Sequence, residues 1–522
     1  MSDARASFYF WAVAVLYGVF WTIFPYWLLP TYRIDIHEML FVGKEGVLAT
    51  FKHPALNSLV LEILFERIGF IAPYLLGQTC FLATAWTVWR LGRKFLAPRE
   101  ALFGALCFYG SWMAIYPVCL YYNHNSVLFV AWGFTTLFAF NAVKQGRCRD
   151  WLWLGVAVGI GMYCKITLVA LVAAIFVYML VDSSARRHLF RPGPYLAALV
   201  SLLIASPLVS WMVQSEFSFL RFPVLQYGLE KTLGNRFYAL AHDGLLAPLL
   251  FISSAVLLLP LFIRKREVIR QPSGDDSEKR YALRFLLGIT VIAWLLLAIP
   301  CFTAAVPKKI ADFLPLAICS GPLLLACRNS VGKAVKANAS RRIWVIFGFT
   351  MVAYVIGFSV YASSPPRNRT QVFHLPGREL AAAAGKIWHG NYREPLPFIV
   401  GKGRNWIYAG VVATYSPERP SFYGDYVPSK TGRREELPLW TWATDADVLR
   451  RGGLAIWEES GETAHLPEDV KERYPSARLI PAAVLLHPYR TKNKSLWFGF
   501  AMIPPDETIP AKPLSPAPLR LW

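Results

Sequence analysis

A dense group of charged side chains follows the first apolar stretch of the sequence. Asp35 and Glu38 stand three positions apart, and Lys52 and His53 come later in the same stretch. Carboxylates at this spacing lie on one face of a helix, where either can take a proton from a hydroxyl group. Lysine and histidine nearby can stabilise negative charge on a phosphate. The stretch therefore has the residue types for base catalysis beside an anionic leaving group.

Simpler interpretations of these residues stay open. The stretch can be a solvated loop between two membrane spans, and an aspartate at a helix start can cap free backbone amides. Lys165 lies between two apolar runs, which favours a functional role because its burial is costly, unless its side chain snorkels to the surface. The apolar residues among the charges favour a helix lying on the membrane surface. They are Met39, Leu40, Val42, Val47 and Leu48.

Composition places the chain among polytopic membrane proteins. Of its 522 residues, 55% are hydrophobic and 17% are charged, and the mean hydropathy is +0.38, which excludes a wholly water-soluble globule. The formal net charge is +21, yet the basic residues fall in short connectors between apolar runs and not on one soluble face. This distribution excludes nucleic acid as a partner and is typical of cytoplasmic loops.

Apolar runs of bilayer-spanning length predict about eleven transmembrane helices. They lie near residues 8–29, 71–90, 100–117, 125–143, 150–164, 166–181, 194–213, 245–263, 282–301, 313–327 and 343–361. Cytoplasmic basic connectors put the N-terminus inside and every residue after 361 outside. The same topology predicts that Lys165 lies at the outer surface.

Three of the expected outer loops are long or polar, and a C-terminal domain follows the last span. The loops are 30–70, 214–244 and a short one that holds Pro307, Lys308, Lys309 and Asp312. We expect a transmembrane domain over 1–364, including the loop 30–70, and a soluble periplasmic α/β domain over 365–522.

Five strands are predicted in the C-terminal domain, with helices before and after the first of them. The strands cover 395–401, 420–426, 452–459, 482–488 and 495–503. The domain contains no phosphate-binding loop, no metal-ligand spacing and no nucleophile elbow. We therefore expect neither a metal nor a cofactor.

The motif order resembles the glycosyltransferase C superfamily, most closely bacterial family 39-like relatives of protein O-mannosyltransferases and of the lipid A aminoarabinose transferase. The resemblance rests on Asp35, Glu38, the pair Lys44-Glu45 and the segment Lys52-His53-Pro54-Ala55-Leu56. The stretches NHNSVLFVAWGFTTLFAF and GRCRDWLWLGVAVGIGMYCKITLVAL are similar to the second outer loop and a following span of these relatives. GRELAAAAGKIW, GDY and FGFAMIPP are similar to the outer domain of the proteobacterial branch.

The resemblance implies an inverting, metal-independent transfer of a sugar from a polyprenyl-phosphate donor to a hydroxyl of an outer-facing acceptor. Asp35 would be the general base, and Glu38 would orient the acceptor or His53. Donor phosphate would be bound by Lys52, His53, Lys165, Lys308 and Lys309. The implied location is a bacterial inner membrane, with the site facing the periplasm and membrane lipid around the spans.

Two positions differ from the pattern of the superfamily. The second outer loop reads Asn123, His124 and Asn125 where many relatives carry an acidic residue, and Ala55 replaces a proline. Asp35 is therefore the main candidate base, and the three second-loop residues are candidates on the acceptor side. A glycolipid such as lipid A or lipopolysaccharide is favoured as the acceptor over a secreted protein.

Two other classes of function fit the sequence less well. A transporter or flippase of lipid-linked sugars would place functional charges near the membrane midplane and show internal repeats, and the sequence has neither feature. A non-catalytic scaffold that binds glycans would leave the charged stretch around Asp35 without a role. Sugar transfer by the purified protein would separate these classes.

Overall fold

The computed structural model describes residues 1–111, 122–218, 222, 232–241, 247–262, 276–303, 312–329, 337–364, 372–401, 405–424, 442–489 and 495–510. Backbone packing divides the chain into two compact units. Unit 1 comprises Met1–Phe24, Pro73–Val209 and Gly228–Phe358, and unit 2 comprises Pro25–Ala72, Ser210–Tyr227 and Ser359–Trp522. The first outer loop thus belongs to the same unit as the C-terminal residues. The domain division expected at residue 364 stays a prediction.

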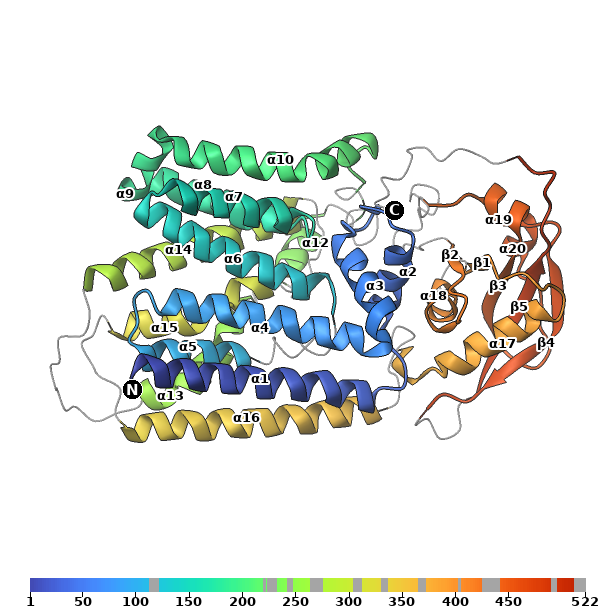
Figure 1. Ribbon diagram of the computed structural model, residues 1–522, viewed down its shortest axis with the longest axis horizontal. Helices are drawn as coiled ribbons and strands as arrows, with labels where there is room; N and C mark the ends of the chain where they lie inside the picture. Colours follow the sequence, from blue (N-terminus) through green and yellow to red (C-terminus); the bar gives the residue numbers. More distant parts are fainter. Residues whose placement is uncertain are drawn as a thin grey trace. The chain divides into compact units, whose positions relative to one another are not determined.

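Unit 1 is helical (Figure 1). Its elements are α1 (Asp3–Leu28), α4 (Ala72–Gly92), α5 (Pro98–Tyr109), α6 (His124–Gln145), α7 (Cys148–Met162), α8 (Leu168–Val181), α9 (Ser183–Arg186), η3 (Arg187–Phe190), α10 (Pro192–Gln214), α12 (Leu233–Ala239), η5 (Ala247–Phe251), α13 (Ile252–Phe262), α14 (Asp276–Thr303), η7 (Leu314–Ala317), α15 (Ser320–Asn329) and α16 (Ala337–Ser363). The last residues of three of these helices, α1, α10 and α16, belong to unit 2.

Each of the eleven expected spans overlaps a helix in the described part of the chain. Five helices there are long and apolar enough to cross a membrane: Asp3–Leu28, His124–Gln145, Pro192–Gln214, Ser277–Thr303 and Ala339–Ser363. A sixth is added if Leu168–Val181 and Ser183–Phe190, bent by 97°, form one span. The chain is a multi-pass membrane protein, and the number of eleven crossings stays a prediction.

Small residues bring the helices of unit 1 close together. A Cβ atom at Gly133 of α6 would lie 2.3 Å from the Thr87 hydroxyl oxygen of α4, so only glycine permits this approach. Aromatic rings fill the contact between α1 and α4, where Phe10 stacks on Trp89 with centroids 4.6 Å apart. The polar residues of unit 1 are thereby carried on closely packed helices.

Unit 2 contains a five-stranded mixed sheet in the order β2-β1-β3-β5-β4. The strands are β1 (Phe398–Val400), β2 (Ser421–Tyr423), β3 (Gly453–Glu459), β4 (Arg478–Leu486) and β5 (Leu496–Ile503). β1 pairs in parallel with β2 and β3, and β5 pairs antiparallel with β3 and β4. Each of the five strands overlaps a segment in which the sequence predicts a strand. Together with the helices, this sheet gives the predicted α/β class for the C-terminal part of the chain.

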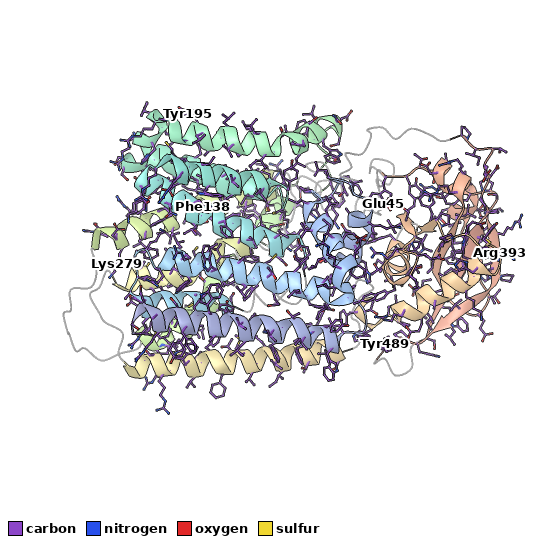
Figure 2. The ribbon with its side chains drawn as sticks, in the orientation of Figure 1. Glu45, Phe138, Tyr195, Lys279, Arg393 and Tyr489 are labelled. Carbon is purple, nitrogen blue, oxygen red and sulfur yellow. The ribbon has the colours of Figure 1, made fainter. Side chains whose placement is uncertain are left out.

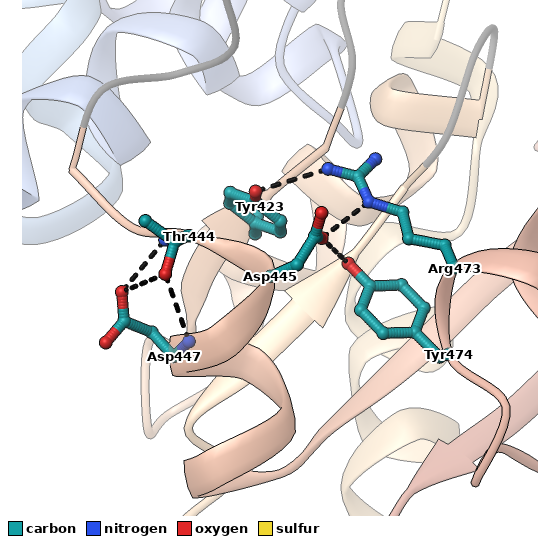
Figure 3. Close-up of polar contacts among 6 residues, drawn as sticks. All are labelled: Tyr423, Thr444, Asp445, Asp447, Arg473 and Tyr474. Carbon is teal, nitrogen blue, oxygen red and sulfur yellow. Dashed lines mark hydrogen bonds and ion pairs between the residues drawn. The ribbon is translucent and has the colours of Figure 1, made fainter. Parts of the chain in front are cut away.

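Helices complete unit 2: α2 (Ile34–Lys44), α3 (Leu56–Ile68), η1 (Gly69–Ile71), η8 (Val372–His374), α17 (Gly377–His389), α18 (Trp406–Tyr415), α19 (Asp445–Arg451) and α20 (Glu468–Arg473). α17 and α18 are the two helices predicted before and after the first strand. The first turn of α19 is tied to the end of α20 in Figure 3, where Asp445 accepts hydrogen bonds from Arg473 and Tyr474. Arg473 also donates to the Tyr423 hydroxyl at the end of β2.

The segment 30–70, predicted to be the first outer loop, shares one hydrophobic core with the sheet. Phe41 of α2 stacks on Phe422 of β2 with ring centroids 4.2 Å apart, and Val42 and Val47 belong to the same buried cluster. Residues Ile36 to Gly43 of α2 are all buried. A helix lying on the membrane surface is therefore the wrong interpretation of this apolar pattern, because protein covers the apolar side chains.

Candidate active site

Asp35 occupies the first turn of α2, which begins at Ile34 with Arg33 in the N-cap position. No side chain caps the helix start by a hydrogen bond, so the capping role considered for Asp35 is not observed. The Asp35 side chain is half-buried. Among the residues that the structure describes, its carboxylate forms neither a hydrogen bond nor an ion pair. The helix dipole favours a negative charge at this position, so an unpaired carboxylate is tolerated there.

Glu38, one turn further along α2, is buried and pairs with Lys52. The Lys52 ammonium donates a hydrogen bond of 2.6 Å to Glu38 Oε2. Only 6% of the Glu38 side chain and 14% of the Lys52 side chain are exposed. The two carboxylates on α2 therefore differ in their partners, because Glu38 forms an ion pair with Lys52 and Asp35 forms none with a described residue.

A tight turn fixes the position of Lys52 and His53. The Thr50 hydroxyl oxygen accepts hydrogen bonds from the backbone N–H groups of Lys52 and His53, and Thr50 N donates to the His53 carbonyl. The backbone of Ala55 then returns to Leu48 through a 2.9 Å hydrogen bond. Thr50 is thus a positioning residue that sequence reasoning missed, since a single threonine carries no motif of its own.

His37 is buried between α2 and α18. Its Nδ1 atom lies 2.9 Å from the Thr414 hydroxyl, which itself donates to the Gly410 carbonyl. Because that hydroxyl hydrogen is already used, Nδ1 of His37 carries a hydrogen and donates it. Burial lowers the pKa of His37 to about 3. The imidazole is therefore neutral, and it locks α2 onto the C-terminal part of unit 2.

A second buried ion pair holds α3. The Arg419 guanidinium donates 2.9 Å hydrogen bonds to both carboxylate oxygens of Glu62 and lies over the Phe65 ring. Burial raises the pKa of Glu62, although Arg419 opposes the shift. Burial also lowers the pKa of Lys44. Glu45, labelled in Figure 2, ends α2 and accepts a hydrogen bond from the Ser421 hydroxyl.

The second outer loop ends in a helix cap. Asn123 is the N-cap of α6, and its side-chain oxygen accepts hydrogen bonds from the backbone N–H groups of Asn125 and Ser126. The Ser126 hydroxyl accepts one from Asn123 N in return, which completes a capping box. This arrangement gives buried Asn123 a structural role. His124 and Asn125, both half-buried, stay candidates on the acceptor side.

Lys165 lies in the turn between α7 and α8. Its ammonium donates a 2.8 Å hydrogen bond to Asn125 Oδ1 and a 2.6 Å hydrogen bond to Asp312 Oδ1. The Lys165 side chain is 13% exposed and that of Asp312 is 19% exposed. An ammonium held in this way does not need to snorkel.

The predicted site residues that the structure describes are divided between the two compact units. Asp35, Glu38, Lys52 and His53 belong to unit 2, whereas Asn125 and Lys165 belong to unit 1. Lys308 and Lys309, the last two residues of the predicted phosphate clamp, lie outside the described residues. In the part of the chain that is described, no group of three or more His, Cys, Asp or Glu is placed to hold a metal ion.

Comparisons with known proteins agree on the fold. Residues 52–211 match the family described as dolichyl-phosphate-mannose-protein mannosyltransferase. The crystal structure of ArnT from Cupriavidus metallidurans bound to undecaprenyl phosphate is similar over 96% of this chain and 98% of its own, with a TM-score of 0.57 and 14% identity. This likeness over nearly the full length shows that the chain has the same fold as that structure.

A second solved structure is more distant. An oligosaccharyltransferase from Archaeoglobus fulgidus, tethered to an acceptor peptide, is similar over 79% of this chain and 64% of its own, with a TM-score of 0.40 and 13% identity. No curated protein matches by sequence. The fold resemblance suggested by the motifs from Asp35 to Leu56 is thus confirmed, and the roles of the individual residues stay predictions.

Proposed function

We propose that this chain is an inverting glycosyltransferase that moves a sugar from a polyprenyl-phosphate donor to a hydroxyl of an acceptor outside a bacterial inner membrane. The proposal rests chiefly on Asp35, a half-buried carboxylate without a partner among the described residues. A general base must be able to contact the hydroxyl whose proton it takes. An unpaired carboxylate meets this need without first breaking an ion pair, which Glu38 would have to do.

In the proposed reaction Asp35 takes the acceptor proton while the acceptor oxygen attacks the anomeric carbon of the donor sugar. The bond from that carbon to the phosphate oxygen breaks on the opposite side, its electron pair stays on the phosphate, and the sugar configuration is inverted. Lys165 stabilises the charge that develops on the leaving phosphate. Lys52, His53, Lys308 and Lys309 are proposed to support the same phosphate, and the step requires no metal.

The proposed donor class is supported by the fold. ArnT from Cupriavidus metallidurans was crystallised with undecaprenyl phosphate, and its whole length corresponds to nearly all of this chain. A polyprenyl phosphate is also the product that leaves after sugar transfer in the proposed reaction. We therefore propose a polyprenyl-phosphate-linked hexose or pentose as the donor.

Two acceptor classes have an observation in their favour. The similarity of the C-terminal segments GRELAAAAGKIW, GDY and FGFAMIPP to the outer domain of the proteobacterial branch favours an envelope glycolipid such as lipid A or lipopolysaccharide. The match of residues 52–211 to a family of protein mannosyltransferases supports a secreted protein instead. We propose the glycolipid, because the resemblance to ArnT extends over the C-terminal residues that the family match does not reach.

Purified full-length protein in lipid nanodiscs tests the proposed function. It is mixed with polyprenyl-phosphate sugars, either aminoarabinose or mannose, and with lipid A or a serine- and threonine-rich peptide. Mass spectrometry of the products should show a sugar added to lipid A. Sugar found on the peptide alone would establish the second acceptor class. Donor movement across liposomes without any transfer would refute the enzyme and establish a flippase.

The proposed orientation has its own test. We propose that the residues from 365 to Trp522 are periplasmic, because basic connectors orient the spans. An alkaline phosphatase fused after Trp522 should then be active, and a green fluorescent protein fused at the same place should be dark. The reverse pattern would overturn the orientation and, with it, a periplasmic position of Asp35.

A further inference from the structure

Three segments that are distant in the sequence meet at the Lys165 ammonium. Asn125 comes from the first turn of α6, Lys165 from the turn between α7 and α8, and Asp312 from the residues just before η7. All three residues belong to unit 1. The contact therefore depends on packing within one compact unit of the chain.

Among the described residues that meet here, Lys165 carries a positive charge and Asp312 a negative charge. A largely buried ammonium is stable only when a counter-ion or strong hydrogen bonds compensate its lost hydration. Asn125 supplies a neutral acceptor, so the compensating charge comes from Asp312. The second outer loop contains Asn123, His124 and Asn125 and thus offers no carboxylate at this point.

We propose that Asp312 is a positioning residue for sugar transfer, which fixes the Lys165 ammonium against the leaving phosphate and replaces the carboxylate that the second outer loop lacks. This inference rests on the proposed function. Asn125 and Asp312 bind the same nitrogen atom, at 2.8 and 2.6 Å. A carboxylate at either position can therefore pair with the ammonium. In this proposal the negative charge can be supplied by residue 125 or by residue 312.

Hydrogen-bond geometry explains how the pair would act. An ammonium has three N–H donors, of which Asn125 and Asp312 accept two. The third has no partner among the described residues. With two donors fixed, the third has a defined direction, and we assign it to the phosphate oxygen of the donor. The ion pair is neutral overall, so it contributes orientation and little long-range attraction for the phosphate.

This difference between orientation and attraction predicts how the kinetic constants divide. Asp312→Asn should lower kcat at least tenfold, because Lys165 no longer points at the developing charge. The KM for the donor should stay the same or fall, since the ammonium loses the carboxylate that competes with phosphate. A purely structural aspartate would lower the amount of folded enzyme and leave the kcat and KM of the remainder unchanged.

Moving the carboxylate across the ammonium gives the decisive experiment. Asn125→Asp alone places two carboxylates on Lys165 and should raise the donor KM at least fivefold. The double variant Asn125→Asp with Asp312→Asn restores one charge and one amide, so its kcat should return to within about threefold of the wild type. Asp182→Asn, which removes the partner of Arg284 elsewhere in unit 1, is the matched control and should change kcat less than twofold.

The outcomes separate this inference from the proposed function. An active wild type with a double variant no faster than Asp312→Asn would overturn the positioning role and leave the transferase intact. A wild type without transferase activity would overturn both. If Asp312→Asn does not fold, the double variant is compared directly with the wild type, and a kcat more than tenfold lower would refute the exchange of roles.

Discussion

Replacing Asp35 by asparagine separates base catalysis from structural support more sharply than any other change in the chain. The substitution keeps the size of the side chain and removes its negative charge. The Asp35 carboxylate caps no backbone amide and has no partner among the described residues. The fold therefore loses only the favourable interaction between this charge and the start of α2, which is typically about 0.3–1 kcal/mol.

The expected catalytic loss is much larger than this structural cost. General-base catalysis contributes about a hundred- to ten-thousandfold in rate, which corresponds to roughly 3–5 kcal/mol of activation free energy. Asp35→Asn should therefore shift the thermal midpoint by only a few degrees while slowing sugar transfer at least about a hundredfold. Donor binding should be unchanged, because the acceptor and not the donor gives its proton to Asp35.

Three measurements on the same preparation check this prediction. Differential scanning fluorimetry gives the thermal midpoint, a radiolabelled donor gives the binding constant, and single-turnover kinetics gives the rate of the chemical step. A folded Asp35→Asn protein that binds donor and transfers sugar at nearly the normal rate would refute the general-base role. The half-buried carboxylate would then be a tolerated charge at a helix start and nothing more.

Glu38→Gln is the matched control because it makes the same chemical change one turn further along α2. It breaks the ion pair with Lys52, whose side chain is only 14% exposed. Removing one partner of such a pair is expected to destabilise the protein by roughly 2–3 kcal/mol. Its turnover should fall less than that of Asp35→Asn. Equal losses of rate in the two variants would contradict the assignment of Asp35 as the base.

Three further predictions concern the folding of unit 2. His37 takes up a proton below pH 6.5 in the unfolded chain but only near pH 3 in the folded chain, so the stability should fall as the pH drops from 6.5 towards 3. His37→Gln should therefore flatten a plot of thermal midpoint against pH. An unchanged slope would show that His37 is not the cause of the pH dependence. Arg419→Met leaves the Glu62 carboxylate buried without its partner and should lower the free energy of unfolding by about 3–5 kcal/mol. Adding Glu62→Gln should recover part of this loss. Purely additive losses in urea unfolding would exclude an energetic coupling between Arg419 and Glu62. Gly43→Ala places a Cβ atom 2.3 Å from the Ser58 carbonyl oxygen, so limited proteolysis should cut α2 and α3 faster, and wild-type rates would show that the crossing can relax.

The elements of this fold are largely predictable from the sequence because they depend on local patterns. Apolar runs of spanning length locate the helices of unit 1, since their composition reflects a requirement of the lipid environment. Short apolar segments such as 482–488 and 495–503 locate β4 and β5 to within a few residues. Neither inference requires knowledge of which segments meet in space.

The burial of α2 is the point at which local patterns mislead. Met39, Leu40 and Val42 have the spacing of a membrane-surface helix, but all three are covered by protein. A sequence gives the periodicity of an apolar face and not the identity of what covers it. The covering residues, such as Phe422 and Trp406, lie more than 350 positions further along the chain. The same packing explains why Asp35, at the edge of that buried helix, keeps a fixed position.

Asp312 shows how a residue can be named in a sequence and be given a proposed role only by its contacts. It stands in a short polar segment with two lysines, where any acidic residue resembles a loop charge. Its proposed role comes from a contact with Lys165, 147 positions away in the sequence, and in the proposal this contact compensates for the lack of an acidic residue in the second loop. If a buried ammonium requires one carboxylate, and either Asn125 or Asp312 can supply it, a relative with an acid at position 125 should tolerate a neutral residue at position 312. The kinetics of the exchanged double variant decide whether this compensation operates within a single chain.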